Sequence, residues 1–317
     1  MVDVNSQVEF VFNAEAGILE RQAVLLCQSI RLFGGALSSS PITIVSPRKS
    51  RRPARSTLDE ISRLGAEFLP LDLDSYCPEY GPSFKVHALA HIASRSGPPI
   101  IVQIDSDSLF VAEPMCLPRI GDAAARPVDV KGMCTTGSLD EFDGYWRVAC
   151  DLLDVSYDAI PVIQTTVDRL LVRASYNGGL FAARRSSGIF ERTEEFFQRL
   201  LSADLKPWNI PGFAIKSGTE LVSEVGSAFW GTSQMSLSLA AIDRGCIVDI
   251  LPETYNVPLH FLEDLDVRAS LPLVHIHYHW LASSGAQEAT PLLDERLNLT
   301  TDVREWLKSQ LPLRVEE

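Results

Sequence analysis

The sequence predicts an α/β fold with a mostly parallel sheet covered by helices on both faces. Short apolar runs such as Val8–Phe12, Pro41–Val45 and Ile100–Ile104 are typical of buried strands. Between them lie segments whose apolar residues recur three and four positions apart, which is the spacing of amphipathic helices. Strands that alternate with helices at this rhythm form parallel sheets with helices on both sides.

Three helices follow from this spacing in the first third of the chain. The first runs from Leu19 to Phe33 and ends at Gly34-Gly35, since glycine pairs commonly terminate helices. The second runs through Leu58 to Gly65, and the third covers Phe84–Arg95, directly before the strand Ile100–Ile104. This part of the chain is therefore a regular alternation of strand and helix.

The second half is less regular, because four prolines interrupt residues 113–175. We expect an insertion there with strands of its own and a helix over Asp143–Leu153. Beyond it, Tyr176–Gly179 is predicted to be a turn that leads into the apolar run Leu180–Ala183. The remaining expected elements are helices over Ser187–Leu201, Ser233–Arg244 and Asp302–Leu311, and strands over Ile247–Leu251 and Leu273–Tyr278.

Composition excludes several classes of protein. The 317 residues carry 41 Asp plus Glu against 28 Lys plus Arg, and a net charge of −13 argues against binding to nucleic acid. The amino terminus has no basic n-region of a signal peptide, and charges interrupt every apolar run before the length of a membrane span. Six scattered cysteines without a CxxC pair suit buried thiols in a reducing compartment. We therefore expect a cytoplasmic protein with one main domain.

Two aspartates stand at the end of a predicted strand, where open α/β sheets bind their ligands. Asp105 and Asp107 directly follow Ile100–Ile104 and are separated by one residue. Hard oxygen ligands at this spacing can share a divalent cation, which would also neutralise a bound diphosphate. The alternative is a polar strand end with solvated carboxylates.

Three of the six histidines fall within five residues near the carboxyl terminus. His275, His277 and His279 recur at a period of two, so in a strand all three would point to one face. A single histidine is more often structural, but this clustering favours a metal site. Two carboxylates with one imidazole favour Mn²⁺, with Mg²⁺ as the alternative, because imidazole is a poor magnesium ligand.

Several of these segments resemble known motifs. Asp105-Ser106-Asp107 resembles the DxD motif of metal-dependent GT-A fold glycosyltransferases, and His277-Tyr278 resembles the histidine that completes their metal site. Tyr176–Phe181 is similar to the FNxG segment of the family-eight, glycogenin-like branch, and Ser233–Leu237 resembles its DQxxL helix start. The loop from Asn13 to Gly17 stands where that fold binds the nucleotide base and ribose. The matching segments occur in the family's order over residues 8 to 280.

The resemblance implies roles for particular residues. Asp107 and His277 would bind the metal, Asp105 would be a third ligand or a partner of the ribose, and His279 or His275 would replace His277 if the register differs. The implied donor-binding residues are Asn13, Ala14, Gly17, Lys85, Asp105, Ser106, Asn177, Gly178 and Gly179. Of these, Lys85 and Asn177 would act in catalysis together with Gln234, which would lie beneath the anomeric carbon of the donor.

One position departs from the family pattern. Ser233 stands where the family usually has an acid, so one sugar-binding carboxylate is missing. Glu220, Glu224 or Asp168 could supply a carboxylate in its place.

The resemblance implies a GT-A, Rossmann-like enzyme that moves a sugar from a nucleotide-diphosphate donor, UDP-sugar being the first candidate, to a hydroxyl with retention of configuration. The acceptor would be a small molecule, a glycan or a protein, and the cofactor Mn²⁺ or Mg²⁺. Residues 1–317 would form one catalytic domain, with a nucleotide-binding half over 8–112, an acceptor and sugar half over 113–282 and a tail over 283–317. A homo-oligomer is compatible with the sequence.

Two other functions remain open at this stage. His275, His277 and His279 could form the three-ligand centre of a zinc hydrolase or lyase. Alternatively, the serine at position 233 would suit a non-catalytic protein that binds nucleotide sugars without turnover.

Overall fold

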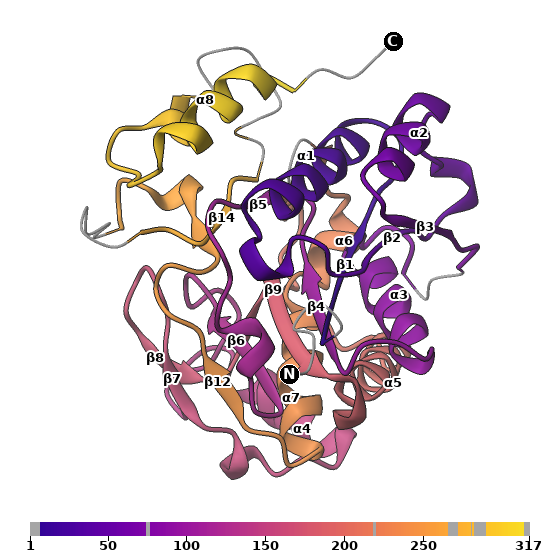
Figure 1. Cartoon of the computed structure of the whole chain (residues 1–317). Helices are drawn as coiled ribbons and strands as arrows, with labels where there is room; N and C mark the ends of the chain where they lie inside the picture. The colour runs from indigo at the N-terminus through magenta and orange to yellow at the C-terminus, as the bar shows by residue number, and fades with distance from the viewer. Residues whose placement is uncertain are drawn as a thin grey trace. The chain divides into compact units, whose positions relative to one another are not determined.

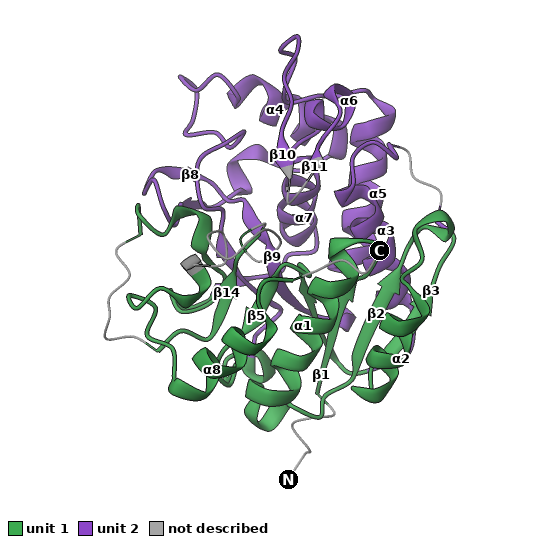
Figure 2. Ribbon diagram, turned by 90° about the horizontal axis from the view of Figure 1, so that it is seen from above, with its two compact units in different colours: residues 1–72, 98–119, 251–317 green, residues 73–97, 120–250 purple. Residues whose placement is uncertain are grey.

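The first strand, β1 (Val8–Asn13), is buried along its length except at its last residue. The structure is a computed structural model, and it describes residues 7–73, 77–217, 220–265, 272–279, 281 and 290–313 (Figure 1). The chain divides into two units that interleave in sequence (Figure 2). Unit 1 comprises Met1–Asp72, Pro98–Arg119 and Leu251–Glu317, and unit 2 comprises Leu73–Gly97 and Ile120–Ile250.

Unit 1 contains four parallel strands in the order β4-β1-β2-β3. Besides β1, these strands are β2 (Ile42–Ser46), β3 (Glu67–Pro70) and β4 (Ile100–Ile104). Helix α1 (Ile18–Phe33) connects β1 to β2, and helix α2 (Arg55–Arg63) connects β2 to β3. Since the strands are parallel, β1 and β4 end at the same edge. The expected alternation of strand and helix is confirmed here.

A second, smaller sheet in unit 1 joins segments that are distant in sequence. It has the order β13-β14-β5, formed by β13 (Val257–Pro258), β14 (His275–His277) and β5 (Ser108–Phe110). Strand β14 runs antiparallel to β5 and places His277 opposite Ser108. Helix α8 (Thr301–Gln310), yellow in Figure 1, packs on α1, where the rings of Trp306 and Phe33 meet edge to face at 5.2 Å.

Unit 2 contains the strand order β12-β6-β9, in which β6 is parallel to β12 and antiparallel to β9. Two-stranded pairs β7-β8 and β10-β11 accompany it. The strands are β6 (Ala123–Pro127), β7 (Val162–Gln164), β8 (Leu171–Arg173), β9 (Tyr176–Arg184), β10 (Lys216–Ser217), β11 (Glu220–Leu221) and β12 (Val248–Ile250). The helices are α3 (Pro82–Ser94), α4 (Asp143–Leu153), α5 (Ile189–Ser202), α6 (Glu224–Ala228) and α7 (Thr232–Asp243).

The strand predicted over Ile100–Ile104 and the helix predicted over Asp143–Leu153 are confirmed residue for residue, and one predicted turn is wrong. The helix expected over Asp143–Leu153 is α4. The turn expected at Tyr176–Gly179 is instead the first half of β9, which is buried from Tyr176 to Ala183. A two-residue hairpin turn at Asn-Gly needs positive φ angles, and neither Gly178 nor Gly179 adopts one. Pairing of Tyr176 with Pro127 of β6 keeps the segment extended.

None of the helices in the described part of the chain is both long enough and apolar enough to cross a bilayer.

The cysteines carry free thiols, several of them buried. Burial raises the pKa of Cys27 to about 11, of Cys150 to about 11 and of Cys134 to about 12. Because alkylation requires the thiolate, we expect iodoacetamide at pH 8 to modify these three only after unfolding. The partly exposed Cys116 and Cys246 are expected to react first. Peptide mass mapping of native and denatured samples checks this, and rapid native labelling of Cys27 would contradict it.

Candidate functional site

Three potential metal ligands converge in unit 1, at the junction of β5 and β14. Nε2 of His277 lies 3.2 Å from Oδ1 of Asp107, and Nδ1 of His279 lies 3.4 Å from Oδ2 of the same carboxylate. All three ligand atoms lie within 4.8 Å of one another. The antiparallel pairing of β5 and β14, continued by a hydrogen bond from the Tyr278 N–H to the Asp107 carbonyl at 3.0 Å, brings these distant segments together.

His279 reaches the group through an unusual backbone conformation. Strand β14 ends at His277, and His279 has a φ of 51°, in the left-handed region. For a residue other than glycine this costs about 1–2 kcal/mol, which the surrounding contacts must offset. One such contact is the hydrogen bond that Nε2 of Gln22 donates to the His279 carbonyl at 3.2 Å. The His279 ring stacks on that of His277, with centroids 3.9 Å apart.

The electrostatics of this group favour the ionised carboxylate of Asp107. Burial alone would raise the pKa of Asp107, but His277 and His279 outweigh it and hold that pKa well below its usual range. A fourth imidazole, His260, packs edge-on against His279 with centroids 4.1 Å apart. Burial, reinforced by His279 and His277, lowers the pKa of His260 to about 3. One carboxylate and neighbouring imidazoles are a donor set that fits a divalent cation.

The other two predicted metal ligands, His275 and Asp105, are not members of this group. His275 is fully buried, and its Nε2 lies 3.0 Å from Oγ of Ser108. Among the described residues, neither His275 nor Asp105 belongs to the metal-ligating group. The three histidines therefore do not form one zinc centre among the described residues, because the His275 ring lies against Ser108 and outside the group of Asp107, His277 and His279.

The predicted nucleotide-binding residues of unit 1 gather where β1 and β4 end. Oγ of Ser106 donates a hydrogen bond to the carbonyl of Asn13, and the N–H of Ala14 donates to Val45 at 2.9 Å. Gly17 has a φ of 100°, and its N–H donates to Oε1 of Glu20 at 3.0 Å. The loop between β1 and α1 is therefore held in place by hydrogen bonds at both ends.

Ion pairs to one buried carboxylate fix the middle of this loop. Glu15 is buried and receives two hydrogen bonds from the Arg48 guanidinium, one of them at 2.7 Å from Nε. Arg51 lies 3.8 Å from the same carboxylate. A bidentate arginine contact adds geometric specificity as well as attraction, so the loop presents a defined shape to a ligand.

In unit 2, three predicted residues from three elements meet. Nζ of Lys85 on α3 donates to the carbonyl of Gly178 on β9 at 3.1 Å. A Cβ added to Gly178 would lie 3.3 Å from Nζ of Lys85 and 3.7 Å from Cγ of Gln234 on α7. Absence of a side chain at Gly178 therefore lets the Lys85 ammonium and the Gln234 amide approach the same stretch of backbone.

Asn177 is oriented by a residue that sequence reasoning did not identify. Its Oδ1 accepts a hydrogen bond from the N–H of Gly179 at 2.8 Å, and its Nδ2 donates to Oδ2 of Asp129 at 2.8 Å. Thr166 donates to the other oxygen of Asp129 at 2.9 Å. Asp129 follows β6 as Asp105 follows β4, so the rule of polar residues at strand ends could have found it.

Ser233 is paired within unit 2. Its Oγ lies 2.9 Å from the hydroxyl of Tyr80, and burial raises the pKa of Tyr80 to about 12. Of the three carboxylates considered as replacements, Glu224 accepts a hydrogen bond from the N–H of Gly212 and Asp168 from that of Lys131. The side chain of Glu220 lies outside the described residues.

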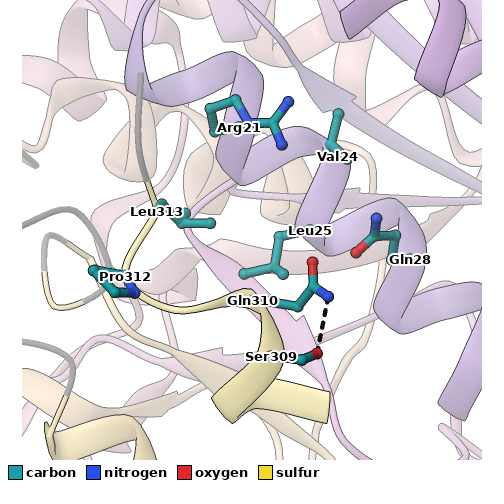
Figure 3. A pocket seen from close by; sticks show the side chains of 8 residues that line it. All are labelled: Arg21, Val24, Leu25, Gln28, Ser309, Gln310, Pro312 and Leu313. Carbon is teal, nitrogen blue, oxygen red and sulfur yellow. Dashed lines mark hydrogen bonds between the residues drawn. The ribbon is translucent and has the colours of Figure 1, made fainter. Parts of the chain in front are cut away.

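A separate pocket lies in unit 1 between α1 and the end of α8 (Figure 3). It measures about 300 Å³ and is lined by Arg21, Val24, Leu25, Gln28, Ser309, Gln310, Pro312 and Leu313. The Arg21 guanidinium pairs with Glu60 at 3.3 Å. None of the predicted site residues lines this pocket.

Comparison with known families shows to which family the chain belongs. The family model described as the Rhodobacterales glycosyltransferase domain matches residues 10–208, which is more than half of the sequence. The chain belongs to this glycosyltransferase family. The matched part of the glycosyltransferase includes Asp105–Asp107 and Asn177–Gly179, and membership decides against the hydrolase or lyase alternative.

Solved structures agree on the fold of this glycosyltransferase. An active-site mutant of LgtC superposes with a TM-score of 0.53 at 10% identity, over 98% of each chain. The galactosyltransferase LgtC in complex with donor and acceptor sugar analogs gives 0.51 at 10% identity, again over 98% of each chain. At this identity the likeness concerns the fold, and it confirms the expected GT-A class. No curated protein matches the sequence significantly.

Substitution of Gly178 by alanine is expected to lower the transfer rate of this glycosyltransferase by about tenfold while changing its stability by less than about 1 kcal/mol. The new methyl group would displace the flexible end of Lys85, which yields easily, but the ammonium would lose its position. Steady-state kinetics and thermal unfolding measure the two effects. Gly144→Ala on α4, where an added Cβ meets nothing within 4 Å, is the control. Equal activity of both variants would contradict the role given to Gly178.

Proposed function

We propose that this glycosyltransferase moves a sugar from a nucleotide-diphosphate donor, with a UDP-sugar as first candidate, to a hydroxyl acceptor with the aid of a divalent cation. The observation that carries the proposal is the convergence of Asp107, His277 and His279 next to the end of β4. A cation held by so few protein ligands keeps positions open for diphosphate oxygens. When bound, it would stabilise the charge that develops on the leaving nucleoside diphosphate.

In this proposal, residues that follow β1 and β4 bind the nucleotide. Asp107 and His277 hold the cation together with His279, and Asp105, which is not a member of that group, accepts a hydrogen bond from the ribose. The loop with Asn13, Ala14 and Gly17 contacts the base and ribose. The hydrogen bond of Ser106 to Asn13 supports this role, because it couples the loop to the end of β4.

A second set of residues would bind the sugar. The Lys85 ammonium would bind an anionic oxygen of the donor or a sugar hydroxyl. The Asn177 amide, oriented by Asp129, and the backbone of Gly178 and Gly179 would contact the sugar. The amide of Gln234 would lie beneath the anomeric carbon. We propose retention of configuration, as in the family-eight enzymes that these segments resemble.

The proposal also covers organisation and location. Residues 8–112 would form the nucleotide-binding half, residues 113–282 the acceptor and sugar half, and residues 283–317 a tail, within a single catalytic domain that acts in the cytoplasm. The acceptor is a small molecule, a glycan or a protein that offers a hydroxyl.

A thermal-shift panel tests the donor and the metal together. The protein is unfolded with UDP-, GDP-, CDP-, ADP- and dTDP-sugars, each with and without Mn²⁺. We expect one nucleotide class to stabilise the protein in a metal-dependent manner, by about 2.7 kcal/mol at a ligand concentration 100 times Kd. Hydrolysis of that donor, abolished by a chelator, would distinguish turnover from binding alone. Absence of a shift with every donor would contradict the proposal.

A further inference from the structure

We infer that Trp208 and Phe213, two side chains of the loop between α5 and β10, form an aromatic platform that binds a sugar ring of the acceptor. The acceptor of this glycosyltransferase is then a saccharide. This inference rests on the proposed function and narrows it, because the acceptor in that proposal is a small molecule, a glycan or a protein. All residues that carry the inference belong to unit 2.

The two rings of the aromatic platform stack on each other and stay partly exposed. Their centroids lie 4.9 Å apart, and their planes differ by 25°. Phe142, at the start of α4, meets the Trp208 ring edge to face at 4.9 Å and supports the stack. Trp208 and Phe213 are both half-buried, whereas Trp146 on α4 is fully buried in the core. Core packing therefore accounts for Trp146 but not for the exposed part of the platform.

Hydrogen bonds hold the platform in place. The N–H of Trp208 donates to the carbonyl of Ala228 at 3.2 Å, and its indole Nε1 donates to the carbonyl of Trp230 at 3.0 Å. The N–H of Gly212 donates to Oε1 of Glu224 at 2.9 Å. These bonds tie the loop to α6 and to the residues that follow it. Because the loop is ordered before a ligand arrives, binding costs little conformational entropy.

The platform adjoins the start of α7, where the proposed sugar-binding residues lie. Trp230, which accepts the indole hydrogen bond, is three residues before Ser233 and four before Gln234. Its ring meets that of Tyr80 with centroids 5.9 Å apart, and the Tyr80 hydroxyl lies 2.9 Å from Oγ of Ser233. A saccharide on the platform would therefore be held next to the residue proposed to lie beneath the anomeric carbon of the donor.

Stacked aromatic side chains suit a carbohydrate ligand. The face of a pyranose ring presents C–H groups with partial positive charge, and the face of an aromatic ring is negative, so the two faces attract. Asn209 is exposed directly after Trp208, and its Nδ2 donates to the carbonyl of Lys206 at 3.1 Å, which orients the amide. Aromatic surface with a few oriented polar groups is typical of sites for small organic ligands.

A lipid surface is the competing ligand for this loop. Ile210, which lies between the two rings in sequence, is 56% exposed and would favour contact with lipid. Against this, the net charge of −13 opposes adsorption to anionic lipids, and the exposed Asn209 would lose its hydration in a bilayer. A saccharide covers the rings and also offers hydroxyls to the amide, so the observations favour a saccharide.

Saturation-transfer NMR on the full-length protein tests binding, with maltose, cellobiose, lactose and N,N′-diacetylchitobiose as probes. We expect at least one of these disaccharides to receive saturation at its ring C–H protons. Phe213→Ala is expected to weaken that binding about 10-fold, because it removes the stacked ring. Phe213→Tyr keeps the ring and is expected to stay within about twofold of the wild type. Absence of binding by all four disaccharides would overturn the inference.

Consumption of the nucleotide sugar tests whether the bound saccharide is the acceptor. We expect the disaccharide to raise the rate of consumption above that of hydrolysis. Phe213→Ala is expected to raise KM for the disaccharide about 10-fold and to leave KM for the nucleotide sugar unchanged. A disaccharide that binds without raising the rate would show that the platform is not part of the acceptor site.

The controls separate this inference from the proposed function. Leu171→Ala removes an apolar side chain that is 62% exposed on β8, and it is expected to leave saccharide binding unchanged. If Phe213→Ala binds disaccharides as the wild type does, the inference is wrong and the proposed function stands. Sedimentation with phosphatidylcholine vesicles that is lost in Phe213→Ala, without saccharide binding, would assign the loop to lipid instead. Absence of a thermal shift with every nucleotide sugar would contradict the proposed function and the acceptor assignment together.

Discussion

Replacement of Asp107 by alanine is expected to lower kcat/KM for the donor by about 1,000-fold or more, equivalent to about 4 kcal/mol of transition-state stabilisation. The carboxylate is the anionic member of the metal-ligating group, and both of its oxygens face imidazole nitrogens. Without it, two neighbouring imidazoles would have no negative charge between them. Steady-state transfer assays with excess Mn²⁺ measure the effect.

Asp151→Ala is the matched control for this substitution. Asp151 is an exposed aspartate on α4, and its removal is expected to leave activity within twofold. Circular dichroism of both variants establishes that they fold. Full activity of the folded Asp107 variant would show that the group containing Asp107, His277 and His279 has no part in catalysis.

Replacement of Lys85 by methionine is expected to reduce kcat/KM by about 100-fold, or about 2.7 kcal/mol. Methionine keeps an unbranched apolar side chain that is one atom shorter, and it removes the ammonium that donates to the Gly178 carbonyl. In the proposed reaction this charge faces the anionic donor. Kinetics at varied donor concentration, with transfer to the acceptor as the readout, measure the loss.

Two further variants serve as controls for the Lys85→Met result. Lys206→Met removes a surface ammonium that pairs with Asp204 and is expected to have no effect. Lys85→Arg retains the charge and is expected to recover part of the activity. If Lys85→Met is folded and as active as the wild type, Lys85 only tethers α3 to β9.

Regular elements could be predicted from the sequence because their signals are local. Strands β1, β2 and β4 and helices α1 and α4 each have an apolar pattern that spans the whole element. Short strands such as β5 and β13 have two or three residues, too few for any periodicity. The error at Asn177-Gly178 has a related cause, since the local preference of Asn-Gly for a turn is overridden by tertiary pairing with β6.

Part of the site could be predicted from local patterns and from motifs. Asp107 and His277 were identified as ligands from motif resemblance, although 170 residues separate them. The position of the His279 ring beside Asp107 depends on a left-handed backbone angle at His279 that no sequence pattern indicates. The contact between Asp129 and Asn177 joins the ends of two strands, β6 and β9, and the sequence alone does not say that these strands are neighbours.

The discontinuity of unit 1 has a consequence for the order in which the protein is made. Strands β1, β2 and β4 leave the ribosome early, but the small sheet that completes this unit needs β14, whose last residue is His277. Most of unit 2, by contrast, is encoded by the uninterrupted segment Ile120–Ile250. About half of the chain is therefore synthesised after Asp107 and before its partner His277. A nascent polypeptide that stalls before β14 lacks the proposed cation site, so ribosome-bound fragments of this enzyme would be inactive.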